Sequence, residues 1–90
     1  YDSARYTNLA RLRAMNQVYL EFHQDAENKH RFYQMFVLPT LFDDWSLVRE
    51  WGRIGSPGTV KKDWFETQAL ADLAFQKISQ EKLNKGYQRR

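Results

Sequence analysis

Alternating apolar and polar positions predict β-strands in the first half of the chain. Val18, Leu20 and Phe22 alternate with more polar neighbours, and this period of two is typical of a strand with one buried face. Residues 31–38, which read RFYQMFVL, are rich in β-forming side chains and apolar on both faces. They predict a central strand that ends at Pro39, because proline cannot donate a hydrogen bond to a neighbouring strand.

Two more strands follow, separated by a tight turn. Residues 45–54 (WSLVREWGRI) predict the third strand, and residues 60–65 (VKKDWF) predict the fourth. The intervening GSPG of residues 55–58 is a turn signal, in which Gly55 and Gly58 are expected at positive φ. Short links between consecutive strands indicate an antiparallel meander.

A single helix is predicted after the fourth strand. Ala71, Ala74, Phe75 and Ile78 recur at the spacing of a buried helical stripe, which Leu70 extends. A helix of about 18 residues would be roughly 27 Å long, enough to cover one face of the sheet. The sequence therefore predicts the α+β class: an antiparallel β-sheet of about four strands packed by one C-terminal α-helix.

Residues at both ends of this helix suit a helix terminus. Thr67 is the expected N-cap, and Gly86 is well placed just beyond the last turn. Lys82 and Lys85 lie near the C-terminal end, where positive charge interacts favourably with the helix dipole. The helix is therefore expected to end shortly before Gly86.

Residues 1–16 are expected to form an N-terminal arm or a short helix ahead of a domain spanning residues 17–90. Leu9, Leu12 and Met15 lie three apart, which is compatible with a helix and equally with a loose arm. A chain of 90 residues is expected to form one domain.

Composition narrows the classes of protein. The absence of cysteine excludes disulfides, cysteine zinc sites and thiol nucleophiles. No apolar run approaches the roughly 18 residues of a membrane span. We therefore expect a cytoplasmic protein that does not enter the membrane.

The distribution of charge says more than its total. The net charge is +3, from 14 basic and 11 acidic side chains. Residues 82–90 contain no acidic residue, and their basic residues are Lys82, Lys85, Arg89 and Arg90. This segment is either a solvated end or part of a surface that binds anions.

The triplet Trp51-Gly52-Arg53 is the main candidate for a binding site. Residues two apart on a strand share a face, so the indole and the guanidinium would lie about 7 Å apart. Arginine offers a forked donor suited to phosphate, and tryptophan offers a stacking plane. Gly52 between them suggests a bulge or the close approach of another backbone. The alternatives are a core tryptophan beneath the helix and an arginine that pairs with an acid such as Asp63.

The stretch around this triplet resembles the signature of the WGR domain family. NKHRFYQM (28–35) resembles the asparagine-containing turn and aromatic second strand of the family, and LFDDWSLVREWGRIGSPG (41–58) resembles its long hairpin. FETQALADLAFQKISQEKLNKGY (65–87) resembles its helix with the closing Lys-x-x-Gly-Tyr. The resemblance covers residues 17–87 and is closest to small free-standing bacterial members.

The resemblance implies a sheet packed by a single helix and a role at DNA ends. In poly(ADP-ribose) polymerases this domain binds DNA at strand breaks through the tryptophan and arginine of the triplet, and a tyrosine after the helix helps hold the terminal phosphate. Those roles would fall here on Trp51, Arg53 and Tyr87. The chain has no room for a transferase domain, so it is not expected to make poly(ADP-ribose).

Other basic residues extend the expected contact, because lysines after the turn and in the C-terminal segment could reach neighbouring phosphates. The candidate nucleic-acid-binding residues are Trp51, Arg53, Lys61, Lys62, Lys85, Tyr87 and Arg89.

Other chemistry has little support in the sequence. His23 and His30 have no second ligand at the spacing of a helical metal site, and they are interpreted as ordinary strand or surface histidines. Asp43 and Asp44 are interpreted as solvated turn acids. We therefore expect no enzyme activity, no cofactor and no metal.

The leading hypothesis is a non-enzymatic module that binds DNA ends, nicks or distorted DNA without reading sequence. The alternative is a protein-interaction module that docks through Trp51 and Arg53, since both residue types favour interface hot spots. A third hypothesis is a structural subunit that pairs through an open sheet edge.

Overall fold

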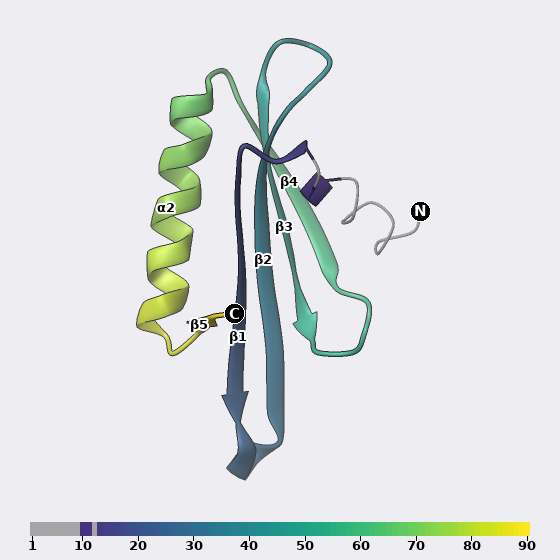
Figure 1. Cartoon of the computed structure of the whole chain (residues 1–90), viewed down its shortest axis with the longest axis vertical. Helices are drawn as coiled ribbons and strands as arrows, with labels where there is room; N and C mark the ends of the chain where they lie inside the picture. Colours follow the sequence, from purple (N-terminus) through teal and green to yellow (C-terminus); the bar gives the residue numbers. More distant parts are fainter. Residues whose placement is uncertain (1–9, 12) are drawn as a thin grey trace.

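The computed structural model describes residues 10, 11 and 13–90, which form one β-sheet and one long helix (Figure 1). The elements follow in the order β1 (Asn16–Gln24), η1 (Asp25–Glu27), β2 (Lys29–Pro39), β3 (Trp45–Arg53), β4 (Thr59–Phe65), α2 (Gln68–Asn84) and β5 (Gln88–Arg89). The sheet is antiparallel and has five strands in the order β4-β3-β2-β1-β5. The α+β class, the meander and the C-terminal helix are confirmed.

The fifth strand was not predicted from the sequence pattern. β5 pairs with β1 through Leu20 opposite Arg89 and Glu21 opposite Gln88. The backbone N–H of Arg90 also donates to the carbonyl of Tyr19 at 3.2 Å. Two residues are too short to show a period of two, and their charge resembles a solvated tail. The basic C-terminal end is therefore attached to the sheet.

The core lies between the sheet and α2. Its fully or almost fully buried members are Leu20, Tyr33, Met35, Val37, Leu47 and Ala71. Ala74, Phe75 and Ile78 pack against them, as predicted. Leu70 does not, because its side chain is 48% exposed. Successive helical residues are rotated by about 100°, so Leu70 lies at the rim of the stripe centred on Ala71.

The opposite face of the sheet has a smaller apolar cluster. Phe36, Leu38 and Val48 are buried there together with Ala10. Residues 10, 11 and 13 have helical backbone, and this described piece lies on the side of the sheet opposite α2 (Figure 1). The expectation for residues 1–16 falls partly outside the described residues.

The predicted helix ends are confirmed. The Thr67 side chain accepts a hydrogen bond from the Leu70 N–H at 3.2 Å, as an N-cap does. Gly86 follows the last turn with φ +105°, and a Cβ there would lie 3.2 Å from the ring of Phe22. Glycine therefore allows the chain to turn from α2 towards β5. No described helix is long and apolar enough to cross a membrane.

Core packing gives a first prediction. Leu47→Ala removes a side chain with no exposed surface and should lower the free energy of unfolding by about 2–5 kcal/mol. Leu73→Ala, at a helix position that is 64% exposed, should change it by about 0.5 kcal/mol or less. Urea denaturation followed by circular dichroism measures both. Equal losses for the two variants would contradict the assignment of the core.

Candidate nucleic-acid interface

Trp51 and Arg53 lie on the same face of β3, the face that α2 partly covers. Trp51 is half-buried, packs against the core cluster, and stacks on Tyr33 with ring centroids 5.8 Å apart and planes 18° apart. Arg53 is exposed and lies opposite Arg31 in the strand register. The indole therefore packs on the core and also lines a cavity.

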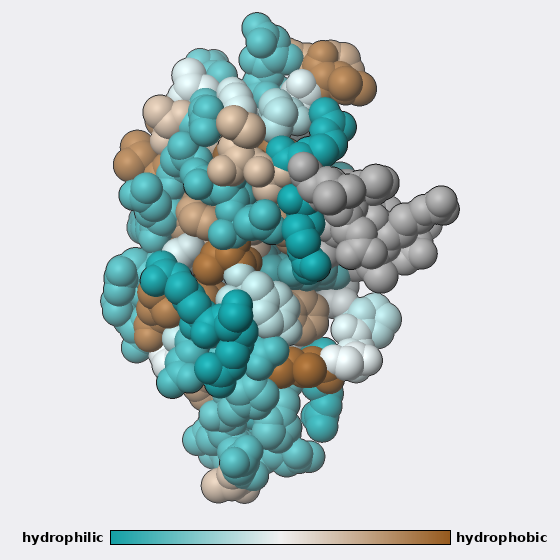
Figure 2. Space-filling view, viewed as in Figure 1, coloured by the Kyte–Doolittle hydropathy of each residue, from teal (hydrophilic) through white to brown (hydrophobic). Residues whose placement is uncertain are grey.

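That cavity has a volume of about 680 Å³. It lies between the part of the sheet where β2 begins and β3 ends and the C-terminal end of α2. We call it the cationic groove. Its aromatic lining residues include Tyr33, Trp51 and Tyr87. Its basic lining residues are Lys29, Arg31, Arg49, Arg53 and Lys82. Hydrophilic residues dominate the lower part of the molecule in the space-filling view (Figure 2).

Arg49 lies at the inner side of the groove and is held by three side chains. One guanidinium nitrogen, Nη2, donates to Asp63 Oδ2 at 3.1 Å, and Nη1 donates to the Tyr33 hydroxyl at 3.4 Å. The guanidinium carbon lies 5.9 Å from the centroid of Trp51. The Nε atom is buried without a hydrogen-bond partner. Asp63 therefore pairs with Arg49, and not with Arg53 as in the alternative that the sequence left open.

Lys82 brings a second cation to the same place. Its ammonium lies 4.6 Å from the ring centroid of Tyr33 and 5.5 Å from that of Tyr87, an arrangement typical of cation–π contacts. Burial, followed by the charges of Lys85 and Arg49, lowers the pKa of Lys82. A bound anion near Arg49 and Lys82 would reduce this repulsion.

The other candidate residues lie around the groove or away from it. Lys61 lies opposite Arg49 on β4 and on the same face, outside the groove lining. Lys85 is the C-cap of α2, and Arg89 is in β5. Lys62 is on the opposite face, where it lines a separate hollow. The groove therefore unites Trp51, Arg53 and Tyr87 but not the four other candidates.

Sequence reasoning missed several of the basic residues that line the groove. Arg49 had a usable signal, because it shares the period-two face of Trp51 and Arg53. Lys82 was considered only as a charge at the helix end and as part of the basic C-terminal segment. Lys29 and Arg31 could not be placed without the register of β2 against β3, which sets Arg31 beside Arg53.

Two glycines allow the turn after β3 to pack closely. A Cβ on Gly52 would lie 3.3 Å from the Cα of Gly58, which confirms the predicted approach of another backbone. A Cβ on Gly58 would lie 2.7 Å from Glu50 Cγ and 2.8 Å from Phe32 Cζ. Gly55 has the expected positive φ of +88°, but Gly58 does not. The prediction for Gly58 was wrong because this position requires space rather than an unusual dihedral angle.

This sheet, helix and triplet belong to a known family: the chain is a member of the WGR domain family, whose model matches residues 16–90. WGR domains are known from nucleic-acid-binding proteins. A curated relative, the uncharacterized protein y4dW of Sinorhizobium fredii (strain NBRC 101917 / NGR234), is 34% identical over 74 residues. The match covers 82% of this chain and 36% of the relative, so the chain spans about a third of that protein. No solved structure matches the chain.

The charge around Trp51 can be tested without any nucleic acid. In the variant Trp45→Phe/Trp64→Phe, where Trp51 is the remaining tryptophan, iodide should quench fluorescence more strongly than caesium. Positive potential from the groove should concentrate the anion near the indole and repel the cation. Equal quenching by both ions, or none by either, would contradict an accessible indole in a cationic groove.

Proposed function

We propose that this WGR domain binds nucleic acid without catalysing a reaction, and that it prefers duplex ends or nicks. The observation that carries the proposal is the cationic groove itself. Basic side chains line it together with aromatic rings, and Asp63 is the acid bonded to Arg49 at its inner side. Phosphate groups supply the complementary charge, and bases or sugars pack on aromatic faces.

The outer and inner parts of the groove would contact different parts of the nucleic acid. Arg53 and Arg31 are exposed and can contact the phosphates of a strand that crosses β2 and β3. Trp51 offers the accessible part of its ring to a sugar or base. The Lys82 ammonium lines the inner side and is positioned for a phosphate that reaches it.

A preference for ends follows from the position of α2. Lys82 and Tyr87 stand on the same face of the sheet as Trp51 and bound the groove on that side. A strand that enters over Arg53 would meet these side chains, which suits a terminus better than a continuous duplex. Little sequence specificity is expected, because α2 uses its apolar face to cover the sheet and the groove offers mainly phosphate contacts.

The proposal is tested by fluorescence anisotropy with a labelled blunt duplex at several salt concentrations. Binding should weaken as salt rises, and Arg53→Ala should reduce the magnitude of the slope of log K against log salt by about 0.9, the value for one phosphate contact. Arg13→Ala removes another exposed arginine, which lines the hollow on the opposite face, and should leave the slope unchanged.

Two results would contradict this proposal. One is the absence of binding to blunt, nicked and single-stranded DNA at low salt. The other is an equal loss of affinity in Arg53→Ala and Arg13→Ala, which would indicate unspecific attraction to positive charge. Tighter binding to an uninterrupted DNA circle than to a linear duplex would overturn only the preference for ends and would leave nucleic-acid binding standing.

A second candidate function, protein docking, is favoured by the loop between β2 and β3. Leu41 and Phe42 are both 88% exposed there, and the space-filling view shows hydrophobic surface at the tip (Figure 2). Exposed apolar side chains of this kind mark interaction sites. Retention of a protein partner after nuclease treatment would favour docking. Loss of that partner in Phe42→Ser would place the docking site at the tip of the β2–β3 loop, and its loss in Arg53→Ala would place it at the groove.

A further inference from the structure

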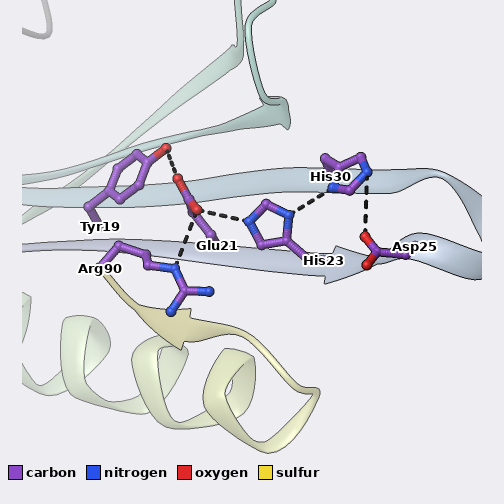
Figure 3. Close-up of polar contacts among 6 residues, drawn as sticks. All are labelled: Tyr19, Glu21, His23, Asp25, His30 and Arg90. Atoms are coloured by element: carbon purple, nitrogen blue, oxygen red, sulfur yellow. Dashed lines mark hydrogen bonds and ion pairs between the residues drawn. The ribbon is translucent and has the colours of Figure 1, made fainter.

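His23 and His30, the two histidines of the chain, lie opposite each other across the β1–β2 hairpin. Their Nδ1 atoms are 2.7 Å apart, and their ring centroids are separated by 5.0 Å (Figure 3). Leu20 on β1 and Tyr33 on β2 pack towards α2, and each is three positions from the histidine of its own strand. Because successive strand residues alternate between faces, both imidazoles project from the opposite face of the sheet, away from Trp51.

The carboxylate of Glu21 fixes the orientation and the protonation of His23. Its Oε1 atom is 2.9 Å from His23 Nε2, and its Oε2 atom accepts a hydrogen bond from the Tyr19 hydroxyl at 2.9 Å (Figure 3). Arg90 Nε lies 3.4 Å from the same Oε1. A carboxylate surrounded by donors acts as an acceptor, so the neutral ring of His23 carries its proton on Nε2. Its Nδ1 then has a free lone pair that faces His30.

Asp25 holds the corresponding place behind His30. Its Oδ1 atom is 3.9 Å from His30 Nε2, which is a charge contact rather than a hydrogen bond. With both rings neutral, His30 donates its Nδ1 proton to His23 Nδ1, because that nitrogen has no proton of its own. The other tautomer of His30 carries its proton on Nε2, facing Asp25. In that form both Nδ1 lone pairs are directed into the space between the two rings.

Two imidazole nitrogens that share one space are the kind of ligand set that first-row transition-metal ions prefer. Bonds from zinc to imidazole nitrogen are about 2.0–2.1 Å long, so tetrahedral coordination needs the two nitrogens about 3.3 Å apart. The Nδ1 contact must therefore open by about 0.6 Å to admit the ion. The side chains of His23 and His30 are 37% and 34% exposed, so small rotations of the rings provide this opening.

The carboxylates behind the rings complete the resemblance to a metal site. Metal-bound histidines almost always donate their other N–H to a carboxylate, a carbonyl or water, and this bond sets the tautomer and the orientation of the ring. Glu21 lies in that position for His23, and Asp25 lies on that side of His30. The hairpin therefore supplies both the ligands and their outer partners.

The pair supplies two ligands, so water must complete the coordination shell. Among the described residues, no group of three or more His, Cys, Asp or Glu side chains is placed to hold a metal ion. Ca²⁺ and Mg²⁺ do not suit the pair, because they take oxygen ligands. The expectation of no metal rested on the ligand spacing of a helix, which does not detect ligands that a hairpin register brings together.

We propose that His23 and His30 bind one divalent transition-metal ion of the Zn²⁺ or Cu²⁺ type through their Nδ1 atoms, with Glu21 and Asp25 orienting the rings. The ion takes the place of the shared proton, which moves through solvent to His30 Nε2, so each ring keeps one N–H. The bound ion ties β1 to β2 beside the turn and stabilises this end of the hairpin. The site is independent of nucleic-acid binding at the groove.

The site is tested by titrating Zn²⁺ into the protein without an affinity tag and recording long-range ¹H–¹⁵N NMR spectra of the imidazoles. The Nδ1 signals of both rings should shift together and saturate at one Zn²⁺ per chain, while both Nε2 atoms stay protonated. EDTA should restore the original spectrum. Binding through Nε2, a shift of one ring alone, or the absence of saturable binding would overturn the proposal.

Single variants distinguish chelation by two rings from the affinity of one ring. His23→Gln and His30→Gln should each weaken Zn²⁺ binding, measured by calorimetry, by more than the roughly tenfold that losing an outer partner costs. Near-UV circular dichroism confirms that both variants fold. Asp43→Asn removes an exposed acid at the other end of β2 and should leave the affinity unchanged. Wild-type affinity in either histidine variant would overturn the two-ligand site.

Glu21→Gln tests the positioning role of the carboxylate. Glutamine keeps the size of the side chain but removes its charge, so Zn²⁺ binding should weaken by about 10–100-fold. In the zinc-free variant, the fraction of His23 protonated on Nε2 should also fall, as read from the same NMR spectra. A purely structural role of Glu21 would leave this tautomer unchanged. Unchanged affinity and an unchanged tautomer would overturn the assignment of Glu21.

Discussion

The register between β2 and β3 is the constraint on which the groove depends. It places Tyr33 opposite Trp51, so the rings stack, and Arg31 opposite Arg53, so two exposed cations lie side by side. A slip by one residue would turn every side chain of one strand to the other face of the sheet. Val37 and Leu47, which lie opposite each other and are fully buried, oppose such a slip, because it would expose core surface. The hydrophobic core thereby fixes the geometry of a polar surface.

Burying the charged side chains of the groove costs free energy, and contacts within the fold partly offset this cost. Arg49 is largely buried, but Asp63 and Tyr33 accept two of its hydrogen bonds, and Trp51 packs against its plane. The Lys82 ammonium makes cation–π contacts with the rings of Tyr33 and Tyr87, and these contacts replace part of its hydration. These contacts hold two like charges close together and leave one buried donor unsatisfied. Local rules of packing and charge are broken in this way most often at functional sites.

The sequence predicted the parts of the fold that depend on local patterns. Four strands, the helix, its Thr67 cap and its Gly86 terminus follow from periodicity and from single-residue chemistry. β5 has no period to detect, because its two residues are ordered by pairing with β1. The candidate site was predicted in part: the face of Trp51 and Arg53 is a local property of one strand. The contact of Lys82 with Tyr33 and the contact of His23 with His30 depend on packing and register, which no local pattern specifies.

The central claim is that nucleic acid binds on the face of the sheet that carries Trp51, and the indole N–H signals of the tryptophans test it most directly. Trp51 lies in the groove, and Trp64, which is 63% exposed, lines the hollow on the opposite face. Heteronuclear NMR during titration with a short blunt duplex should show a large shift or broadening of the Trp51 indole signal and little change for Trp64. A shift of Trp64 with an unchanged Trp51 signal would contradict the account.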